Sequence, residues 1–188
     1  LFYFALKLDE RKAALLFFLF GFVLYCTGLY WLYISIHIVS GAPKVLALLL
    51  IALLSVYLSI FHSIFGFVFV KLHRRISSEW ISLLFVAPSL WIFLEFLRGY
   101  FLTGFPWFSL GYMESGSLIS SWAPIGGIYL VSMVMAMISS GILLIFLKKR
   151  LLGSSIIVVL SISSYILGAV DWTSKSNESS YKVALVQG

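Results

Sequence analysis

Long stretches of apolar residues dominate this chain, and short segments between them carry nearly all of its charge. Four of the stretches without charged residues reach 20 residues or more, enough for an α-helix to cross a hydrocarbon core of about 30 Å. A spanning segment must be a helix or part of a closed barrel, because lipid offers the backbone no hydrogen-bond partner. The runs are continuous and do not alternate between apolar and polar residues, which excludes barrel strands.

The pattern therefore predicts an all-α fold, a polytopic transmembrane helical bundle of about five spanning helices. The predicted helices cover residues 13–37, 45–70, 80–98, 125–147 and 151–170. They would form a transmembrane domain over residues 1–170, followed by a polar linker at 171–181. Residues 182–188 form a short β-like run, which predicts the first strand of a further domain.

The basic residues indicate the orientation of this bundle, because cytoplasmic loops of membrane proteins are enriched in Lys and Arg. If the helices alternate in direction, nine of the 13 basic residues fall on one side, in segments 7–12, 71–75 and 148–150. The other side receives Lys44, Arg98, Lys175 and Lys182. We therefore expect the nine-residue side to face the cytoplasm, with loop 99–124 and the C-terminal tail outside.

Hydrophobic residues make up 62% of the chain and charged residues only 11%, whereas about a quarter of a soluble domain is charged. The net charge of +6 is carried by the connecting segments, so it indicates topology and not nucleic-acid binding. The single cysteine, Cys26, excludes an internal disulfide and a multi-cysteine metal site, and no spacing of the histidines suggests a metal. Because the chain starts without Met on an apolar stretch, we expect a fragment of a longer protein.

Small residues recur at helical spacing on three of the predicted helices. The sets are Gly21, Gly28 and Ser35; Ser55, Ser59 and Ser63; and Ser132, Ala136 and Ser140. Such faces let helices approach closely in lipid, so we interpret them as packing surfaces. The alternative is a polar path through a transporter, but the chain has no internal repeat and no membrane-embedded series of acidic residues.

The stretch EFLRGYFLTGFPWFSLGY, residues 95–112, interrupts the apolar pattern. Glu95 and Arg98 are three residues apart near the end of the third predicted helix, so they share a face and can form an ion pair there. In the other interpretation, Arg98 reaches headgroup depth and helps to hold an anionic group such as a lipid phosphate.

The connection 99–124 is long for a loop between helices and contains aromatic residues but almost no charge. We therefore expect it to lie on the membrane surface or to dip into the membrane. Gly104 and Pro106 would set a turn that Trp107 anchors at headgroup depth, with Trp31 at the same level. An aromatic belt explains single aromatic residues, but the order Thr-Gly-Phe-Pro-Trp favours a specific re-entrant shape.

Seven short motifs follow one another along the chain: WLYISIH (31–37), APSLW (87–91), EFLRG (95–99), TGFPW (103–107), GY (111–112), APIGG (123–127) and VALVQG (183–188). Each motif is weak alone. In this order they closely resemble the apolipoprotein N-acyltransferase family of the bacterial inner membrane, over nearly the whole chain.

The resemblance implies a specific activity. Family members transfer an acyl chain from a phospholipid, usually phosphatidylethanolamine, to the N-terminal diacylglyceryl-cysteine of lipoproteins. A periplasmic nitrilase-like α/β domain with a Glu-Lys-Cys triad carries out this chemistry through a thioester, since a thiolate splits one difficult transfer into two easier steps. Residues 182–188 would be the first strand of that domain. The triad would lie beyond Gly188, so no catalytic residue is expected here, and Cys26 would be a packing residue.

We thus expect a membrane domain in the bacterial inner membrane, with its C-terminal side periplasmic, that belongs to a monomeric acyltransferase without a cofactor. Its partners would be a phosphatidylethanolamine-like phospholipid donor, the apolipoprotein N-terminus and the membrane, but no nucleic acid. Candidate substrate-binding residues, forming an entrance for lipids, are Glu95, Arg98, Gly104, Pro106, Trp107 and Tyr112. The alternative function is a non-catalytic bundle such as a transporter or lipid-flipping module.

Overall fold

Helices account for all regular secondary structure in residues 1–173 and Ala184, the part of the chain that the computed structural model describes. Five helical segments are long and apolar enough to cross a membrane, which confirms the predicted all-α bundle. The expected linker beyond residue 173, and the expected strand at 182–188 apart from Ala184, lie outside the described residues.

The long helices are α2 (Glu10–Gly28), α4 (Lys44–His73), α6 (Ala87–Tyr100), α7 (Ala123–Phe146) and α8 (Arg150–Gly168). Shorter helices precede them: α1 (Phe2–Ala5), α3 (Trp31–Tyr33) and α5 (Glu79–Ile81). The connections also contain two π-helical segments, η1 (Ile34–Val39) and η2 (Ser82–Val86), and three 3₁₀ segments, η3 (Phe101–Thr103), η4 (Leu110–Glu114) and η5 (Leu118–Trp122).

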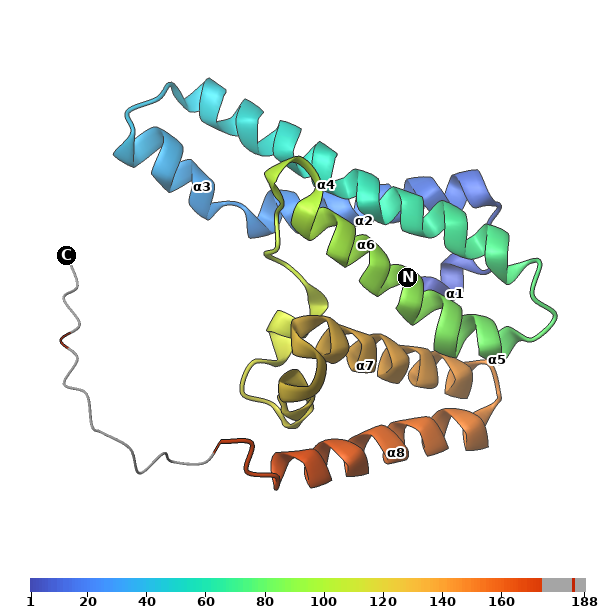
Figure 1. Ribbon diagram of the computed structural model, residues 1–188. Coiled ribbons are helices and arrows are strands. Elements are labelled where there is room, and N and C mark those ends of the chain that lie inside the picture. The colour runs from blue at the N-terminus through green and yellow to red at the C-terminus, as the bar shows by residue number, and fades with distance from the viewer. Residues whose placement is uncertain (174–183, 185–188) are drawn as a thin grey trace.

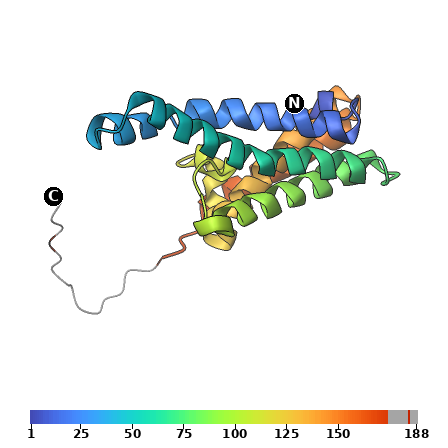
Figure 2. The same cartoon turned by 90° about the horizontal axis from the view of Figure 1, so that it is seen from above.

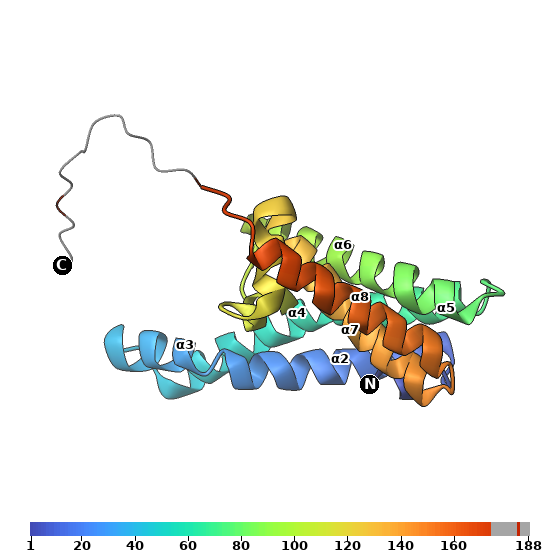
Figure 3. The same cartoon turned by 90° about the horizontal axis from the view of Figure 1, so that it is seen from below.

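The long helices pack as two pairs joined by α6 (Figure 1). Helix α2 lies along α4, as Figures 2 and 3 also show, while α7 packs on α8 and α6 contacts both α4 and α7. Small residues permit the α2–α4 contact: a Cβ on Gly66 would lie 2.7 Å from the carbonyl oxygen of Ala13, and one on Gly21 would lie 3.1 Å from the His62 ring. The predicted packing role of Gly21 is therefore confirmed.

The three connections rich in Lys and Arg lie at one end of the bundle, which we call the basic end (right in Figure 1). Two ion pairs join them: Arg74 to Glu10 at 3.4 Å, and Lys149 to Glu79 at 2.7 Å. At the same end Asp9 caps α2 by accepting the backbone N–H of Lys12 at 2.8 Å. That hydrogen bond lowers the pKa of Asp9. The 101–122 connection lies at the opposite end, which we call the loop end.

One continuous helix over 13–37 is a wrong prediction, because α2 ends at Gly28 and the chain turns at Leu29 before α3 begins. A tertiary contact lies at this break. The ring of Phe108 occupies the space next to Gly28, where a Cβ would clash with it. The notch at Gly28 therefore receives a residue from the 101–122 connection.

The third predicted helix also differs in detail from a regular α-helix. Pro88 has no N–H to donate to the residue four positions earlier, and its ring would press on that carbonyl. The π-helical segment η2 lies directly before it and absorbs this irregularity. In α7 the backbone leaves helical geometry at Gly126 and at Gly127, whose φ is +62°, so the regular part of that helix begins later than predicted.

Candidate functional site

Glu95 lies on α6 and is only 6% exposed. Its Oε1 atom accepts a hydrogen bond from the indole N–H of Trp91, one turn earlier, at 2.9 Å. The same oxygen accepts the backbone N–H of Leu110 at 2.7 Å. A buried carboxylate needs such donors to offset its loss of hydration. Glu95 thereby fixes the 105–112 segment to the helix.

Arg98, one turn further along α6, is 2% exposed and holds the same segment. One terminal nitrogen of its guanidinium donates to the hydroxyl of Tyr25 on α2, and the other donates to Ser109 Oγ at 3.2 Å. The backbone carbonyl of Arg98 also accepts the N–H of Phe105 at 2.9 Å. Arg98 therefore joins α2, α6 and the loop.

The expected ion pair between Glu95 and Arg98 is not formed, although both residues are on α6. In residues 1–173 and Ala184, the ion pairs with an N···O distance of 4.0 Å or less are Lys12–Asp9, Arg74–Glu10 and Lys149–Glu79. Each side chain instead turns toward the loop, where Leu110 and Ser109 provide a donor and an acceptor. Because Arg98 is buried among protein groups, it does not stand free at the end of the helix.

The loop that these residues hold has an unusual backbone. Leu102, Thr103 and Phe108 have φ values of 48°, 72° and 63°, a region that side chains with a Cβ rarely adopt. Gly104 combines φ +80° with ψ 146°, a conformation almost restricted to glycine. Strain of this kind persists only where surrounding contacts determine the chain path.

The loop packs into the bundle and does not extend away from it. Phe105 and Phe108 pack against the buried cluster around Tyr25 and Leu29, and the rings of Tyr25 and Phe108 are 5.8 Å apart in an edge-to-face arrangement. The Gly111 N–H donates to Ser132 Oγ on α7 at 2.8 Å. The low charge of this segment predicts that it lies on or in the membrane, and the contacts above hold part of it against the bundle.

A surface hollow of about 560 Å³ opens at the loop end, and we call it the tryptophan hollow. Its lining consists of Trp31, Pro106, Trp107, Phe108, Ser109, Tyr112 and Met113. Trp107 and Tyr112 are 56% and 52% exposed. The walls are mostly apolar and aromatic, so the hollow offers hydrocarbon a surface but no concentrated charge.

A separate, smaller cavity lies behind the hollow, and we call it the polar cavity. It is lined by His62, Trp91, Leu94, Glu95, Arg98 and Phe108, with further aromatic residues of α4. Phe108 lines both spaces.

The candidate residues from the sequence thus fall into three places. Pro106, Trp107 and Tyr112 line the tryptophan hollow, Glu95 and Arg98 line the polar cavity, and Gly104 shapes the turn between them. Sequence reasoning missed the inner partners Tyr25, His62, Trp91 and Ser109, and the lining residues Phe108 and Met113. For Trp91 the spacing of four residues before Glu95 was an available signal.

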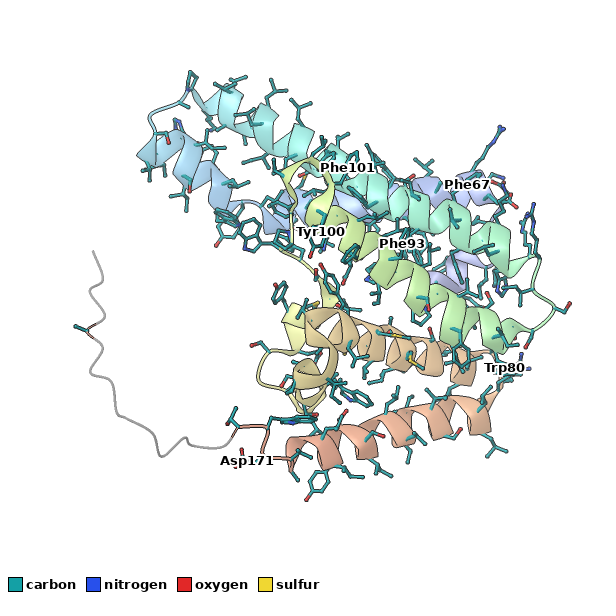
Figure 4. The ribbon with its side chains drawn as sticks, viewed as in Figure 1. Phe67, Trp80, Phe93, Tyr100, Phe101 and Asp171 are labelled. Atoms are coloured by element: carbon teal, nitrogen blue, oxygen red, sulfur yellow. The ribbon has the colours of Figure 1, made fainter. Side chains whose placement is uncertain are left out.

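Aromatic residues mark both ends of the third span. Trp80 lies at the basic end, whereas Tyr100 and Phe101 lie at the other end of α6 (Figure 4). Asp171 follows α8, and its position in Figure 4 is also away from Trp80. Trp80 is 41% exposed and Trp107 is 56% exposed. Trp80 is therefore an exposed tryptophan at the basic end that can serve as a control for substitutions of Trp107.

Other reactive side chains do not extend this site. Cys26 is a free thiol that is partly exposed on α2. The Nδ1–H of His37 donates to the backbone carbonyl of Ala42 at 2.7 Å. In the described part of the chain, groups of three or more His, Cys, Asp or Glu that could hold a metal ion are absent.

Comparison with known proteins gives consistent matches. The sequence model of the family described as "Apolipoprotein N-acyltransferase N-terminal domain" matches residues 1–141. The apolipoprotein N-acyltransferase of Vibrio cholerae is 35% identical over 181 residues, covering 96% of this chain and 35% of that protein. That of Coxiella burnetii is 35% identical (90% and 36% covered), and that of Pseudomonas syringae pv. tomato 33% identical (100% and 38% covered). The chain therefore spans about a third of the length of these relatives.

Proposed function

The chain belongs to the apolipoprotein N-acyltransferase family, and from this membership we propose that it forms the membrane part of an enzyme that N-acylates lipoproteins. The observation that carries the proposal is the family match over residues 1–141. We propose that the acyl donor is a phospholipid of the phosphatidylethanolamine type and that the acceptor is the N-terminal diacylglyceryl-cysteine of an apolipoprotein. The protein would act as a monomer.

The reaction would proceed in two steps through a thioester. A thiolate attacks the ester carbonyl of the donor and releases the lysophospholipid; the α-amine of the acceptor then attacks the thioester and regenerates the thiol. We assign the Glu-Lys-Cys triad to a nitrilase-like domain that follows this chain. Cys26 takes no part, because it lies on α2, a helix long and apolar enough to cross the membrane.

Within this scheme the candidate residues form a lipid entrance at the loop end. Pro106, Trp107 and Tyr112 would contact the acyl chains of a donor in the tryptophan hollow, where apolar walls favour hydrocarbon. Glu95 and Arg98 would position the loop, because both side chains are buried and hydrogen-bonded to loop residues. For the same reason they would not bind phosphate. Gly104 would set the turn.

A direct test uses the full-length protein in proteoliposomes with a synthetic diacylglyceryl-cysteine peptide. We expect the peptide to gain the mass of one acyl chain, with stoichiometric formation of lysophospholipid. A control measures the transbilayer movement of a fluorescent phospholipid in the same vesicles. Lipid movement without acylation would instead support the lipid-flipping alternative and would contradict the proposed activity.

Truncation of the aromatic wall should impair use of the donor. Trp107→Ala removes a large apolar surface worth about 1.5–3 kcal/mol when fully buried by a ligand, so KM for the phospholipid should rise roughly tenfold. The melting temperature should stay within error because the side chain is 56% exposed. Trp80→Ala, at the basic end, is the matched control and should leave KM unchanged. Equal KM values for the two variants would remove Trp107 from the lipid entrance.

The proposed orientation places the basic end in the cytoplasm and the loop end in the periplasm of a bacterial inner-membrane protein. In a Cys26→Ala background, cysteines at positions 75 or 150 should resist an impermeant thiol reagent in intact cells. A cysteine at exposed Ser115 should react. All three should react after the cells are permeabilised. Labelling at 75 or 150 in intact cells, with protection at 115, would reverse the orientation.

A further inference from the structure

Helix α8 is held in the bundle by different contacts at its two ends. Near the basic end its backbone touches α7, since a Cβ on Gly153 would clash with the carbonyl oxygen of Gly141. At the loop end the 3₁₀ segment η5 contacts both α7 and α8 (Figures 1 and 3). The segment η5 therefore gives the loop end of α8 a second attachment, far from the glycine contact.

One buried serine of α8 makes the polar contacts with η5. Ser164 is fully buried, and its Oγ accepts the indole N–H of Trp122, the last residue of η5, at 2.9 Å. The same hydroxyl donates to the Leu160 carbonyl at 2.8 Å, which fixes the direction of its lone pairs. The hydroxyl of Ser121 lies 2.7 Å from the Ser164 carbonyl, but also 2.7 Å from that of Leu118. The indole is thus the donor committed to α8.

The contact continues one turn further along α8. Gly168 and Ser164 are four residues apart and share a helix face, and a Cβ on Gly168 would lie 3.8 Å from Ser121. We call the contact of residues 118–122 with Ser164 and Gly168 the η5–α8 contact. Gly168 is the last residue of α8, and Asp171 follows at the same end of the bundle (Figure 4). The η5–α8 contact therefore lies where the chain leaves this helix.

The connection that makes this contact also carries the tryptophan hollow. Residues 106–109, 112 and 113 line the hollow, and residues 118–122 of the same connection lie against α8. The part before them is fixed to α6 by Glu95 and Arg98 and to α7 by Ser132. The hollow and the end of α8 are therefore joined through one bonded segment.

A small tilt of α8 would change this geometry considerably. Gly168 lies about 22 Å from Gly153 along the helix at a rise of about 1.5 Å per residue, so a tilt of about 5° around the glycine contact moves the loop end by about 2 Å. A misplacement of about 1 Å can lower the rate of an enzyme about 10²-fold. A hydrogen bond at the far end of the helix is well placed to oppose such a tilt.

We propose that Ser164 is a positioning residue, which holds the end of α8 and the chain that follows it at a fixed place relative to the tryptophan hollow. This role rests on the proposed function, because it requires a donor lipid in the hollow and a catalytic domain after α8. The hydrogen bond between Trp122 and Ser164 then keeps the ester of the bound donor within reach of that domain. It contributes to the rate of transfer and not to donor affinity, since neither residue lines the hollow.

The first test measures geometry and needs no turnover. In the full-length protein with Cys26→Ala, spin labels are attached to cysteines at Met113, beside the hollow, and at Asp171, after α8; both positions are exposed. We expect a narrow distribution of distances between the labels in this background. Ser164→Ala and Trp122→Phe should each broaden the distribution, because each removes the same hydrogen bond and leaves most of the packing in place.

Ser155→Ala is the matched control for Ser164→Ala. Ser155 is an exposed serine of the same helix, and its hydroxyl also donates to a carbonyl of α8, that of Leu152 at 2.9 Å. The substitution therefore removes an intrahelical hydrogen bond of the same kind without touching η5. It should leave the distance distribution unchanged.

The second test separates rate from affinity. Ser164→Ala should lower kcat for acyl transfer about tenfold and leave KM for the phospholipid unchanged, the opposite of the pattern expected for Trp107→Ala. Adding Trp122→Phe to Ser164→Ala should cause no further loss, because both substitutions remove one and the same interaction. Ser155→Ala should keep the wild-type kcat.

An unchanged distance distribution in Ser164→Ala would overturn the proposal, as would an equal broadening in Ser155→Ala. A raised KM with an unchanged kcat, or additive losses in the double variant, would also contradict it, because Ser164 would then act in donor binding or independently of Trp122. If Trp122→Phe does not fold, Ser164→Ala and its control decide. A wild-type protein that transfers no acyl chain would refute the proposed function, and the spin-label distances would still decide whether the η5–α8 contact fixes the two parts.

Discussion

Gly104→Ala should lower acyl transfer by the full-length protein at least about tenfold, because two independent effects act at this position. The first is conformational: with φ +80° and ψ 146°, residue 104 lies in a region that costs about 1–3 kcal/mol for a residue with a Cβ. The second is steric, since the added Cβ would clash with the backbone carbonyl of Gly99. A backbone atom cannot turn aside as a side chain does, so the turn itself must change.

The consequence of that change should be local. Residues 105–112 carry Trp107 and the two attachments at Ser109 and Leu110, so a displaced turn misplaces the whole tryptophan hollow. The five spanning helices do not depend on the turn for their insertion. We therefore expect normal expression in the membrane, with turnover lost and with increased protease sensitivity near residue 104.

Gly116→Ala is a matched control. Gly116 has φ +83°, close to that of Gly104, but nothing lies within 4 Å of the position where its Cβ would be. This variant should show a small loss of stability from backbone strain and nearly full acyl transfer. If both variants lose activity equally, the contact with Gly99 is not the cause, and a wild-type rate for Gly104→Ala would sink the proposed role of the turn.

Arg98→Ala should destabilise the protein by about 3–5 kcal/mol, because it removes two hydrogen bonds from a buried charged donor, each worth about 1.5–3 kcal/mol. It also frees the Tyr25 hydroxyl and Ser109 Oγ from their donor. We expect a lower melting temperature in detergent and lower activity together. Arg75→Ala, which removes an exposed arginine at the basic end, should have little effect on either.

Two further variants separate charge from geometry at the same position. Arg98→Lys keeps the charge but not the planar fork that reaches two acceptors, so it should recover only part of the stability. Glu95→Gln combined with Arg98→Gln removes both charges and should be more stable than Arg98→Ala alone. A melting temperature equal to wild type for Arg98→Ala would show that the buried network contributes little, and would leave Arg98 to a role in lipid contact.

The bundle could be predicted from the sequence because lipid leaves few choices. An uncharged run such as 45–70 must become a helix in a membrane, and α4 covers that run completely. The break after Gly28 could not be predicted, since helical propensity alone does not end a helix in lipid. The break coincides with the place where the ring of Phe108, a residue far along the chain, packs beside Gly28.

The candidate site was predictable in composition but not in geometry. The order Thr-Gly-Phe-Pro-Trp indicated a shaped turn, and Trp31 was expected at the level of Trp107; both residues line the hollow. The spacing of Glu95 and Arg98 indicated one helix face, which suggested a pair. Local spacing cannot reveal a competing partner such as the Leu110 N–H, which becomes available only when the loop folds back.

The hydrogen bond between Arg98 and Tyr25 joins positions 73 residues apart in sequence, and this separation has a consequence for biogenesis. During synthesis residues 98–109 are made after α2 and α4, so when these two helices are first made Tyr25 lacks its donor and the notch at Gly28 is unfilled. Contacts of long sequence separation form late. Docking of Phe108 and Arg98 on α2 therefore follows the insertion of the third span. Until then the C-terminal end of α2 lacks these contacts, and we expect proteases to cleave the nascent chain there more readily.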